Sequence, residues 1–367
     1  LDEGAGDTDS KTFHERVEAK AIELSFGATR DYVSGSMRTL TENRDEAVRL
    51  LKLALTAPRF ESDDVERIRA QMLSELRRST TSPNDLASER WWATAFPGHP
   101  YGRPQRGTLT SVLAITADDL RGFTHNMFAR DNLKVAIVGN IDAAAAGQLI
   151  DQVFGSLPAS AALVPVPTAV PQALGQKVAI DLDVPQSVLV MGGPGIMRKD
   201  PDFMAAYVLN HILGGSPFSS RLYKEVREAR GLAYSVYSSV LPLDHAALFM
   251  SGTATRFDRA GQALEVMQAE VRKLAETGPT EEELAKAKSY LTGSYPLRFD
   301  TSTKIAEQLV GIQLEDLGID YIDKRNTLVN AVTLDDVKRV ARRLLDTGML
   351  VTVVGKPQPV PATAKGG

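Results

Sequence analysis

The 367-residue sequence contains no cysteine. Disulfide bonds, thiolate zinc sites, iron–sulfur clusters and cysteine nucleophiles are therefore excluded within it. Its 42 lysines and arginines are outnumbered by 46 aspartates and glutamates, and the net charge of −4 provides no basic surface for nucleic acid. No apolar run approaches the roughly 20 residues that a helix needs to span a bilayer, so we expect no membrane span.

Histidine is also scarce, and its spacing forms no metal site. No two of the five histidines lie three or four residues apart, as paired zinc ligands on one helix would require. They are His14, His99, His125, His211 and His245. The glycine-rich run at 192–195 lacks the lysine and the spacing of a phosphate-binding loop, and we interpret it as a turn at a strand end.

A capped helix followed by an apolar strand occurs twice. Residues 115–139 read ITADDLRGFTHNMFARDNLKVAIVG, and residues 332–355 read VTLDDVKRVARRLLDTGMLVTVVG. In each copy a threonine precedes two aspartates, a pattern typical of an N-cap and favourable to the helix dipole. In each copy an apolar strand is predicted to end in Val-Gly. A second pair of helical segments repeats in the same order, so we predict an internal duplication.

Each half mixes strands and helices. Strands are predicted within 22–40 and 186–195, and helices at 45–55 and 202–213. The strands occur in neighbouring runs followed by several helices, rather than alternating one for one. This order favours an α+β fold, with an antiparallel-rich sheet backed by helices in each half.

A stretch rich in proline and alanine at 158–176 interrupts both helical and strand periodicity. We therefore predict an N-terminal domain at 1–157, a linker at 158–176 and a homologous C-terminal domain at 177–367. The chain begins at Leu1 rather than with methionine. We expect a mature or truncated product whose true N-terminus lies upstream.

Two segments carry the most specific patterns in the chain. They are HPYGRPQRGTLTSVLAITADDL at 99–120 and GGSPFSSRLYKEVREARGLAYSVYS at 214–238. Together with the duplicated halves, they resemble the insulinase or pitrilysin family, which includes the mitochondrial processing peptidases. The resemblance covers nearly the whole chain. It implies two homologous α+β halves that form a clam-shell.

The resemblance also implies a role for Arg227 and Tyr234. In that family the second half contributes an arginine and a tyrosine, seven residues apart, that hold the substrate carbonyl and stabilise the oxyanion. A guanidinium on a helix and a phenol on a strand can converge on one oxygen when a tight turn at Gly231 folds the strand back. Donors aimed at developing negative charge contribute roughly 3 to 4 kcal/mol each in comparable sites. Without the resemblance, the residues favour a surface arginine and a core tyrosine.

Zinc is the cofactor that the resemblance implies. Active subunits of the family bind it through an HxxEH helix in the first half and a downstream glutamate. Aligned from Gly4 and Asp31, the HxxEH segment would end just before Leu1, and the third ligand would be Glu75. Ile68 stands where active members usually have a further glutamate. A glutamate in such a charged helix is also expected by chance, so Glu75 is only a candidate ligand.

These departures favour the non-zinc subunit of the bacterial heterodimers in the family. Such a chain would be inactive alone and would supply Arg227 and Tyr234 to an HxxEH-bearing partner that holds the zinc. The resemblance implies peptides or unfolded proteins as substrates, and its exported bacterial members favour a periplasmic location. Two alternatives stay open. One is a complete homodimeric zinc peptidase whose HxxEH lies upstream, and the other is a non-proteolytic scaffold of the same fold.

Overall fold

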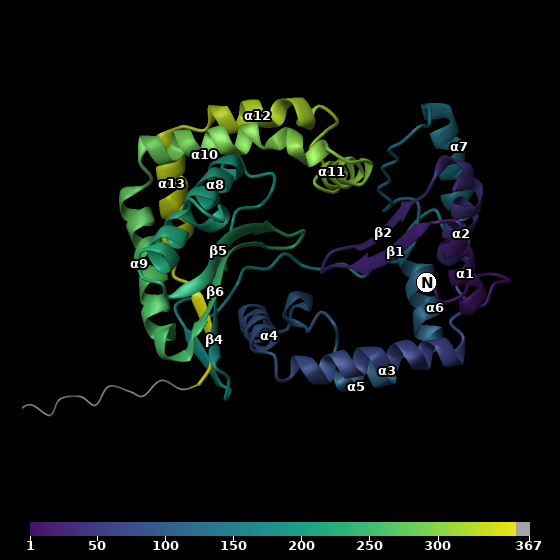
Figure 1. Cartoon of the computed structure of the whole chain (residues 1–367), viewed down its shortest axis with the longest axis horizontal. Coiled ribbons are helices and arrows are strands. Elements are labelled where there is room, and N and C mark those ends of the chain that lie inside the picture. The colour runs from purple at the N-terminus through teal and green to yellow at the C-terminus, as the bar shows by residue number, and fades with distance from the viewer. Residues whose placement is uncertain (357–367) are drawn as a thin grey trace, which may run out of the picture. The chain divides into compact units, whose positions relative to one another are not determined.

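The structure is a computed structural model that describes residues 1–356, and these residues pack into two compact units (Figure 1). Unit 1 comprises Leu1–Arg77, Gln105–Pro165 and Pro296–Tyr321. Unit 2 comprises Arg78–Pro104, Val166–Tyr295 and the chain from Ile322 onward. Each unit therefore combines segments that are distant in sequence. The boundaries predicted at 1–157, 158–176 and 177–367 concern the sequence repeat and stay predictions.

Unit 1 contains a hairpin with helices on one face. Strands β1 (Glu23–Ala28) and β2 (Val33–Arg38) pair antiparallel, as the sequence of 22–40 predicts. Phe13 and Leu50, from the first two helices, pack with Phe26 of β1 in a small core. The helices of the unit are α1 (Ser10–Ala19), α2 (Arg44–Thr56), most of α3 (Ser62–Ser79), α5 (Leu109–Ala114), α6 (Ala117–Met127), α7 (Ala143–Phe154) and α11 (Ser302–Leu314).

Unit 2 contains a five-stranded sheet in the order β3-β7-β4-β6-β5. Its strands are β3 (Lys177–Asp181), β4 (Gln186–Pro194), β5 (Ala233–Pro242), β6 (Ala247–Arg256) and β7 (Leu350–Gly355). Only β3 and β7 pair in parallel, and the other neighbours are antiparallel. The antiparallel-rich α+β class predicted from the sequence is confirmed.

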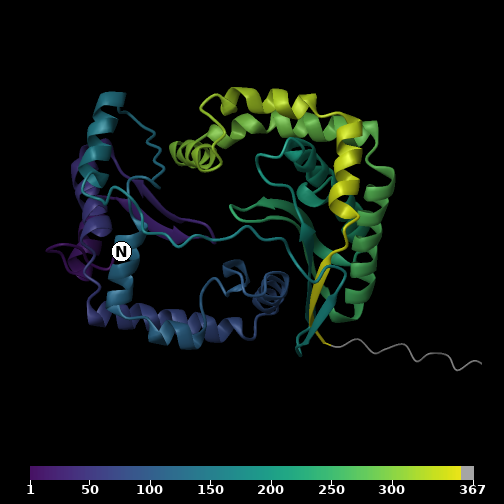
Figure 2. The same cartoon turned by 180° about the vertical axis from the view of Figure 1, so that it is seen from behind.

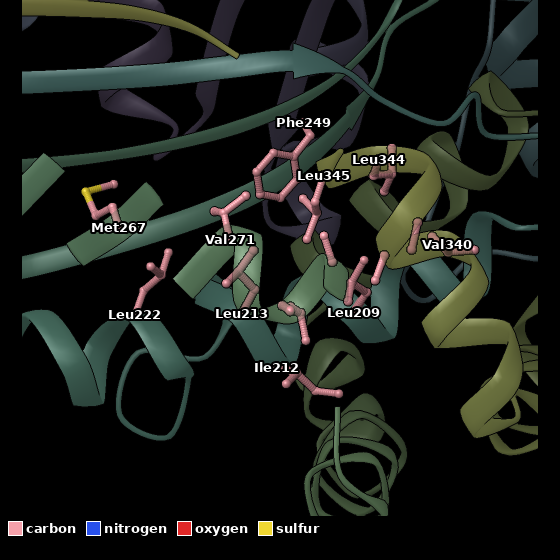
Figure 3. Close-up of a cluster of buried hydrophobic side chains, with 14 of the residues drawn as sticks. Leu209, Ile212, Leu213, Leu222, Phe249, Met267, Val271, Val340, Leu344 and Leu345 are labelled. Carbon is pink, nitrogen blue, oxygen red and sulfur yellow. The ribbon is translucent and has the colours of Figure 1, made fainter. Parts of the chain in front are cut away.

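Helices cover both faces of this sheet. Successive residues of a strand point to opposite faces, and both faces of β4 are buried. Leu189 faces the larger core, whereas Val188 faces a second core around Trp91. Figure 3 shows part of the larger core, with Phe249 beside leucines of the helices. The helices of the unit are α4 (Pro83–Ala95), α8 (Phe203–Asn210), α9 (Ala260–Thr277), α10 (Glu281–Gly293), α12 (Tyr321–Ala331) and α13 (Leu334–Leu345). Helices α9 and α13 lie side by side over the larger core, as Figure 2 also shows. None of the helices among residues 1–356 is both long and apolar enough to cross a membrane.

Helix α4 closes the second face of the sheet through Trp91. This side chain is fully buried, and its Nε1 donates a hydrogen bond to the carbonyl oxygen of Leu350 at 3.1 Å. A Cβ atom on Gly192 would lie 2.8 Å from Cζ2 of Trp91, so only glycine lets the ring approach β4. The interpretation of 192–195 as a turn is wrong for Gly192 and Gly193, which lie within β4 and pair with Met250 and Phe249 of β6.

One predicted strand does not form. The first copy of the repeat, residues 133–139, has the apolar sequence LKVAIVG but no strand geometry. In the second copy, β7 lies between β3 and β4 and is hydrogen-bonded to both. No backbone hydrogen bond joins 133–138 to another segment of the chain up to residue 356, although the carbonyl oxygen of Val135 accepts one from Nε2 of Gln313 at 3.0 Å. The strand predicted there is wrong because a strand needs a neighbour to pair with.

We expect this difference to appear in amide exchange. The amides of 134–138 should exchange with deuterium at least a hundredfold faster than those of β7, because exchange follows local hydrogen bonding and opening. Hydrogen–deuterium exchange with mass spectrometry measures both segments in one experiment. Equal protection of the two segments would contradict the unpaired backbone of 133–138.

Candidate functional site

Arg227 lies in a helical turn that is wider than an α-helix. The segment Tyr223–Glu228 is a π-helix, and its wider turn is closed by the amide of Ala229, which donates to the carbonyl oxygen of Lys224 at 2.8 Å. Single π-turns are rare and often occur at functional sites. Leu222 and Val226 on the same helix are fully buried, so the helix that carries Arg227 is firmly attached to the core of unit 2.

The start of this helix is held by an ion pair. The Nε and Nη2 atoms of Arg221 donate to the two carboxylate oxygens of Glu283, each at 2.7 Å. Nη2 also donates to the carbonyl oxygen of Gly278 at 3.2 Å. Burial, the largest single influence, would raise the pKa of the Glu283 carboxyl, but the hydrogen bonds and charge of Arg221 and the hydrogen bonds from Thr280 together outweigh it, and the pKa falls to about 2. Such a forked, partly buried pair fixes the position of the helix on α10.

A glycine turns the chain from this helix into β5. Gly231 has a φ of +57°, in the region that side chains with a Cβ rarely adopt. Its amide donates to the carbonyl oxygen of Arg227 at 2.9 Å, and that of Leu232 donates to Val226 at 2.8 Å. These bonds are typical of a helix that ends at a glycine. The tight turn predicted at Gly231 is confirmed.

Tyr234 lies in a β-bulge at the start of β5. The register between β5 and β6 moves from Ala233 opposite Thr255 to Val236 opposite Thr253, so two residues of β5 face one of β6. β5 is one of the two edge strands of the sheet, and Tyr234 is 81% exposed. Bulges commonly redirect a side chain beside a functional site. The alternative in which Tyr234 is a core aromatic residue is wrong.

The turn and the bulge bring the two candidate residues together. The Cζ atom of Arg227 lies 4.5 Å from the ring centroid of Tyr234 and 5.0 Å from that of Tyr223. Both distances fit cation–π contacts. No hydrogen bond or ion pair within residues 1–356 involves the Arg227 side chain. The N–H groups of a fixed, half-buried guanidinium are therefore free to bind an external oxygen.

The structure does not build a zinc site around Glu75. This residue lies on α3, in unit 1, and its Oε1 is 3.5 Å from the side-chain amide of Gln71. Within residues 1–356 no three or more histidine, aspartate or glutamate side chains gather as metal ligands would. A lone half-buried carboxylate is an incomplete donor set, because zinc sites in proteins use three or four. The described residues therefore hold no complete zinc site, and Glu75 stays a candidate ligand.

Two aromatic residues beside the pair were not predicted from the sequence. The ring of Tyr223 contacts the Arg227 guanidinium. The two residues are four positions apart on one helix, and this spacing was a sequence signal for the contact. Phe218, in the preceding loop, packs edge-on against Tyr223 with ring centroids 5.7 Å apart. Its exposure could not be deduced from the sequence.

Comparison with known proteins identifies the family of the chain. Residues 114–291 match the family described as the peptidase M16 inactive domain. An uncharacterized zinc protease of Streptomyces coelicolor is 30% identical over 352 residues, which cover 92% of this chain and 75% of that protein. The chain belongs to the M16 peptidase family. The resemblance to insulinase-like peptidases stated from the sequence is confirmed.

Other M16 relatives include proteins described as lacking activity. A non-peptidase homolog of Helicobacter pylori is 28% identical over 305 residues, covering 82% of this chain and 69% of that protein. The crystal structure of an M16 inactive domain from Pseudomonas fluorescens matches 97% of this chain and 86% of its own, with a TM-score of 0.91 and 29% identity. The M16 fold and membership of the family are thus shown for nearly the whole chain.

We predict that Gly231→Ala lowers the melting temperature. No atom lies within 4 Å of an added Cβ, so the penalty is conformational, about 1 to 2 kcal/mol for an L side chain at this φ. The matched control is Gly293→Ala, at the end of α10, which also has open space and no positive φ. Scanning calorimetry should show a lower melting temperature for Gly231→Ala and not for the control. An equal effect of both changes would contradict the strained-turn argument.

We also predict an acid-sensitive contribution from Glu283. Its folded-state pKa of about 2 lies below the ordinary 4.5, so its ion pair stabilises unit 2 fully above pH 4.5 and is lost as the pH falls toward 2. Between pH 5 and pH 3 the melting temperature of Glu283→Gln should fall less steeply than that of the parent chain. The control is Glu281→Gln, at an exposed position of the same helical turn. Parallel curves for the parent and Glu283→Gln would contradict the prediction.

Proposed function

We propose that this chain is the non-zinc subunit of a heterodimeric M16 peptidase, and that it supplies Arg227 and Tyr234 to the active site of an HxxEH-bearing homologous subunit. The observation that carries the proposal is the contact between an uncommitted guanidinium and an exposed phenol. The match to an M16 inactive domain supports it, as does the name of the non-peptidase homolog.

The pair suits a peptide carbonyl oxygen. Arginine keeps its charge at every physiological pH and presents several N–H donors, and the tyrosine hydroxyl adds one neutral donor. A carbonyl oxygen gains negative charge when a nucleophile attacks its carbon, and hydrogen bonds from a charged donor strengthen as that charge grows. Arg227 and Tyr234 would therefore bind the tetrahedral intermediate more tightly than the substrate, which lowers the barrier.

The proposed substrates are short or unfolded peptides. Among residues 1–356 no strand pairs with the outer edge of β5, and Tyr234 lies near the start of this strand. An extended peptide can hydrogen-bond to such an edge through its backbone alone, which makes binding largely independent of sequence. The proposal includes a periplasmic location, on the resemblance to exported bacterial members of the family.

A self-sufficient homodimeric zinc peptidase is the second candidate. It is favoured by the relatives named zinc proteases, such as the one from Streptomyces coelicolor. The test is to purify the chain with its native N-terminus, alone and with an HxxEH-bearing homologous subunit, and to measure zinc content and peptide cleavage. Our proposal expects a zinc-free, inert chain that becomes active with the partner. Bound zinc and cleavage by the chain alone would establish the second candidate, and an inert mixture would favour a scaffold.

We predict that Tyr234→Phe lowers kcat/KM of the assembled complex at least tenfold, because a lost oxyanion donor typically costs more than that. The exposed hydroxyl makes no hydrogen bond within the described chain, so folding and assembly should be unchanged. Tyr237→Phe is the matched control, since it removes a hydroxyl from the same strand. Peptide turnover and complex formation by size-exclusion chromatography are the measurements. Unchanged turnover in Tyr234→Phe would rule out the oxyanion role.

A further inference from the structure

Glu270 is a buried acidic residue that the proposed active site does not use. It lies on the apolar face of α9, three positions after Met267 and four before Leu274, and it is only 9% exposed. Within residues 1–356 its carboxylate accepts no hydrogen bond. The Nζ atom of Lys273 lies 4.0 Å from its Oε1, too far for a direct hydrogen bond. Because a buried charge without hydrogen bonds is costly, this carboxylate is suited to accept a hydrogen bond from a ligand.

Glu270 lines a hollow on the surface of unit 2. The hollow has a volume of about 390 Å³ and lies between α9, the start of α10 and the helix that carries Arg227. Sites for small molecules in proteins commonly measure roughly 300 to 1,000 Å³, so this hollow suits a ligand at the small end of that range. Arg221, Lys224 and Lys273 line it together with Glu270, and all four residues belong to unit 2.

The charged groups around the hollow are only partly paired. Glu283 is paired with Arg221, and Glu225 is paired with Arg230. The side chain of Lys224 is exposed and forms no hydrogen bond or ion pair within residues 1–356. The Nη1 atom of Arg221 is buried and has no hydrogen-bond partner in the described part of the chain. The hollow thus combines one buried acceptor with cationic donors that the fold does not use.

We propose that this hollow binds a small zwitterion, namely a free α-amino acid or a dipeptide. The ammonium group of the ligand would donate to the Glu270 carboxylate, and its carboxylate would accept from the ammonium groups of Lys224 and Lys273. These charge-assisted hydrogen bonds would offset the burial of Glu270. The inference goes beyond the proposed function, since binding needs only residues of unit 2. Where the proposed function holds, amino acids and short peptides are products of cleavage, and the hollow would bind a product beside the ion pair that holds the Arg227 helix.

The experiment is isothermal titration calorimetry on the full chain. Glycine, leucine and glycyl-leucine are the probes. Each is compared with its N-acetylated form, which lacks the ammonium group, and with its amidated form, which lacks the carboxylate. At least one zwitterion should bind saturably, and both of its modified forms should bind at least tenfold more weakly, because each loses a charge-assisted hydrogen bond. The bound zwitterion should also raise the melting temperature of the chain.

Variants test whether the ligand lies in the hollow. Glu270→Gln should lower the affinity for the zwitterion at least tenfold and remove the preference over the N-acetylated form. The double change Lys224→Met and Lys273→Met should instead remove the preference over the amidated form. Glu276→Gln, an exposed change on the same helix, is the matched control and should leave the affinity unchanged. The melting temperature of each ligand-free variant checks its folding.

The other outcomes overturn the proposal. Equal binding of the N-acetylated form would show a simple anion site, and equal binding of the amidated form would show a simple cation site. No binding of any probe, or an equal loss in Glu270→Gln and Glu276→Gln, would exclude the zwitterion from the hollow. If a variant does not fold, the comparison of the three forms on the parent chain still decides which charges the site requires. Because the titration uses the chain alone, its result is independent of peptide cleavage by the assembled complex.

Discussion

The site depends on the contact of one guanidinium with two tyrosine rings. An arginine held by a carboxylate uses its donors on that partner, as Arg221 does with Glu283 at the start of the same helix. Arg227 is positioned instead by the rings of Tyr223 and Tyr234, through an attraction to the ring face that uses none of its N–H groups. The helix thus carries a structural arginine and, six positions later, an arginine whose donors remain available.

Three departures from regular secondary structure produce that contact. The π-turn widens the helix around Arg227, the positive φ of Gly231 reverses the chain, and the bulge in β5 redirects Tyr234. Regular elements lie on either side, and their apolar residues are buried in the larger core of unit 2. Local irregularity is tolerated here because the surrounding packing determines the backbone, a pattern expected at a functional site.

The parts of this arrangement that local sequence determines were predictable. A glycine between a helix pattern and a strand pattern predicts a turn, and Gly231 makes one. The strands of 22–40 and 186–195 follow from alternation and apolar content. Long-range pairing was not predictable, because it depends on which segments meet. Residues 133–139 have a strand-type sequence like that of β7, but within residues 1–356 no other strand pairs with them. Trp91, far earlier in the chain, packs in unit 2 on the carbonyl oxygen of Leu350. The π-turn was missed because no residue pattern marks it.

The exposure of the pair gives a physical reason why activity would require assembly. Tyr234 is 81% exposed, and in water a hydrogen bond to a developing oxyanion competes with solvent and is screened by the high dielectric constant. A partner that covers the edge of β5 would exclude this water and make the same donors several times more effective. Assembly would then lower the barrier in two ways. The partner would bring its own catalytic groups, and it would also exclude water from Arg227 and Tyr234. For that reason a small-molecule nucleophile added to the isolated chain should not replace the partner.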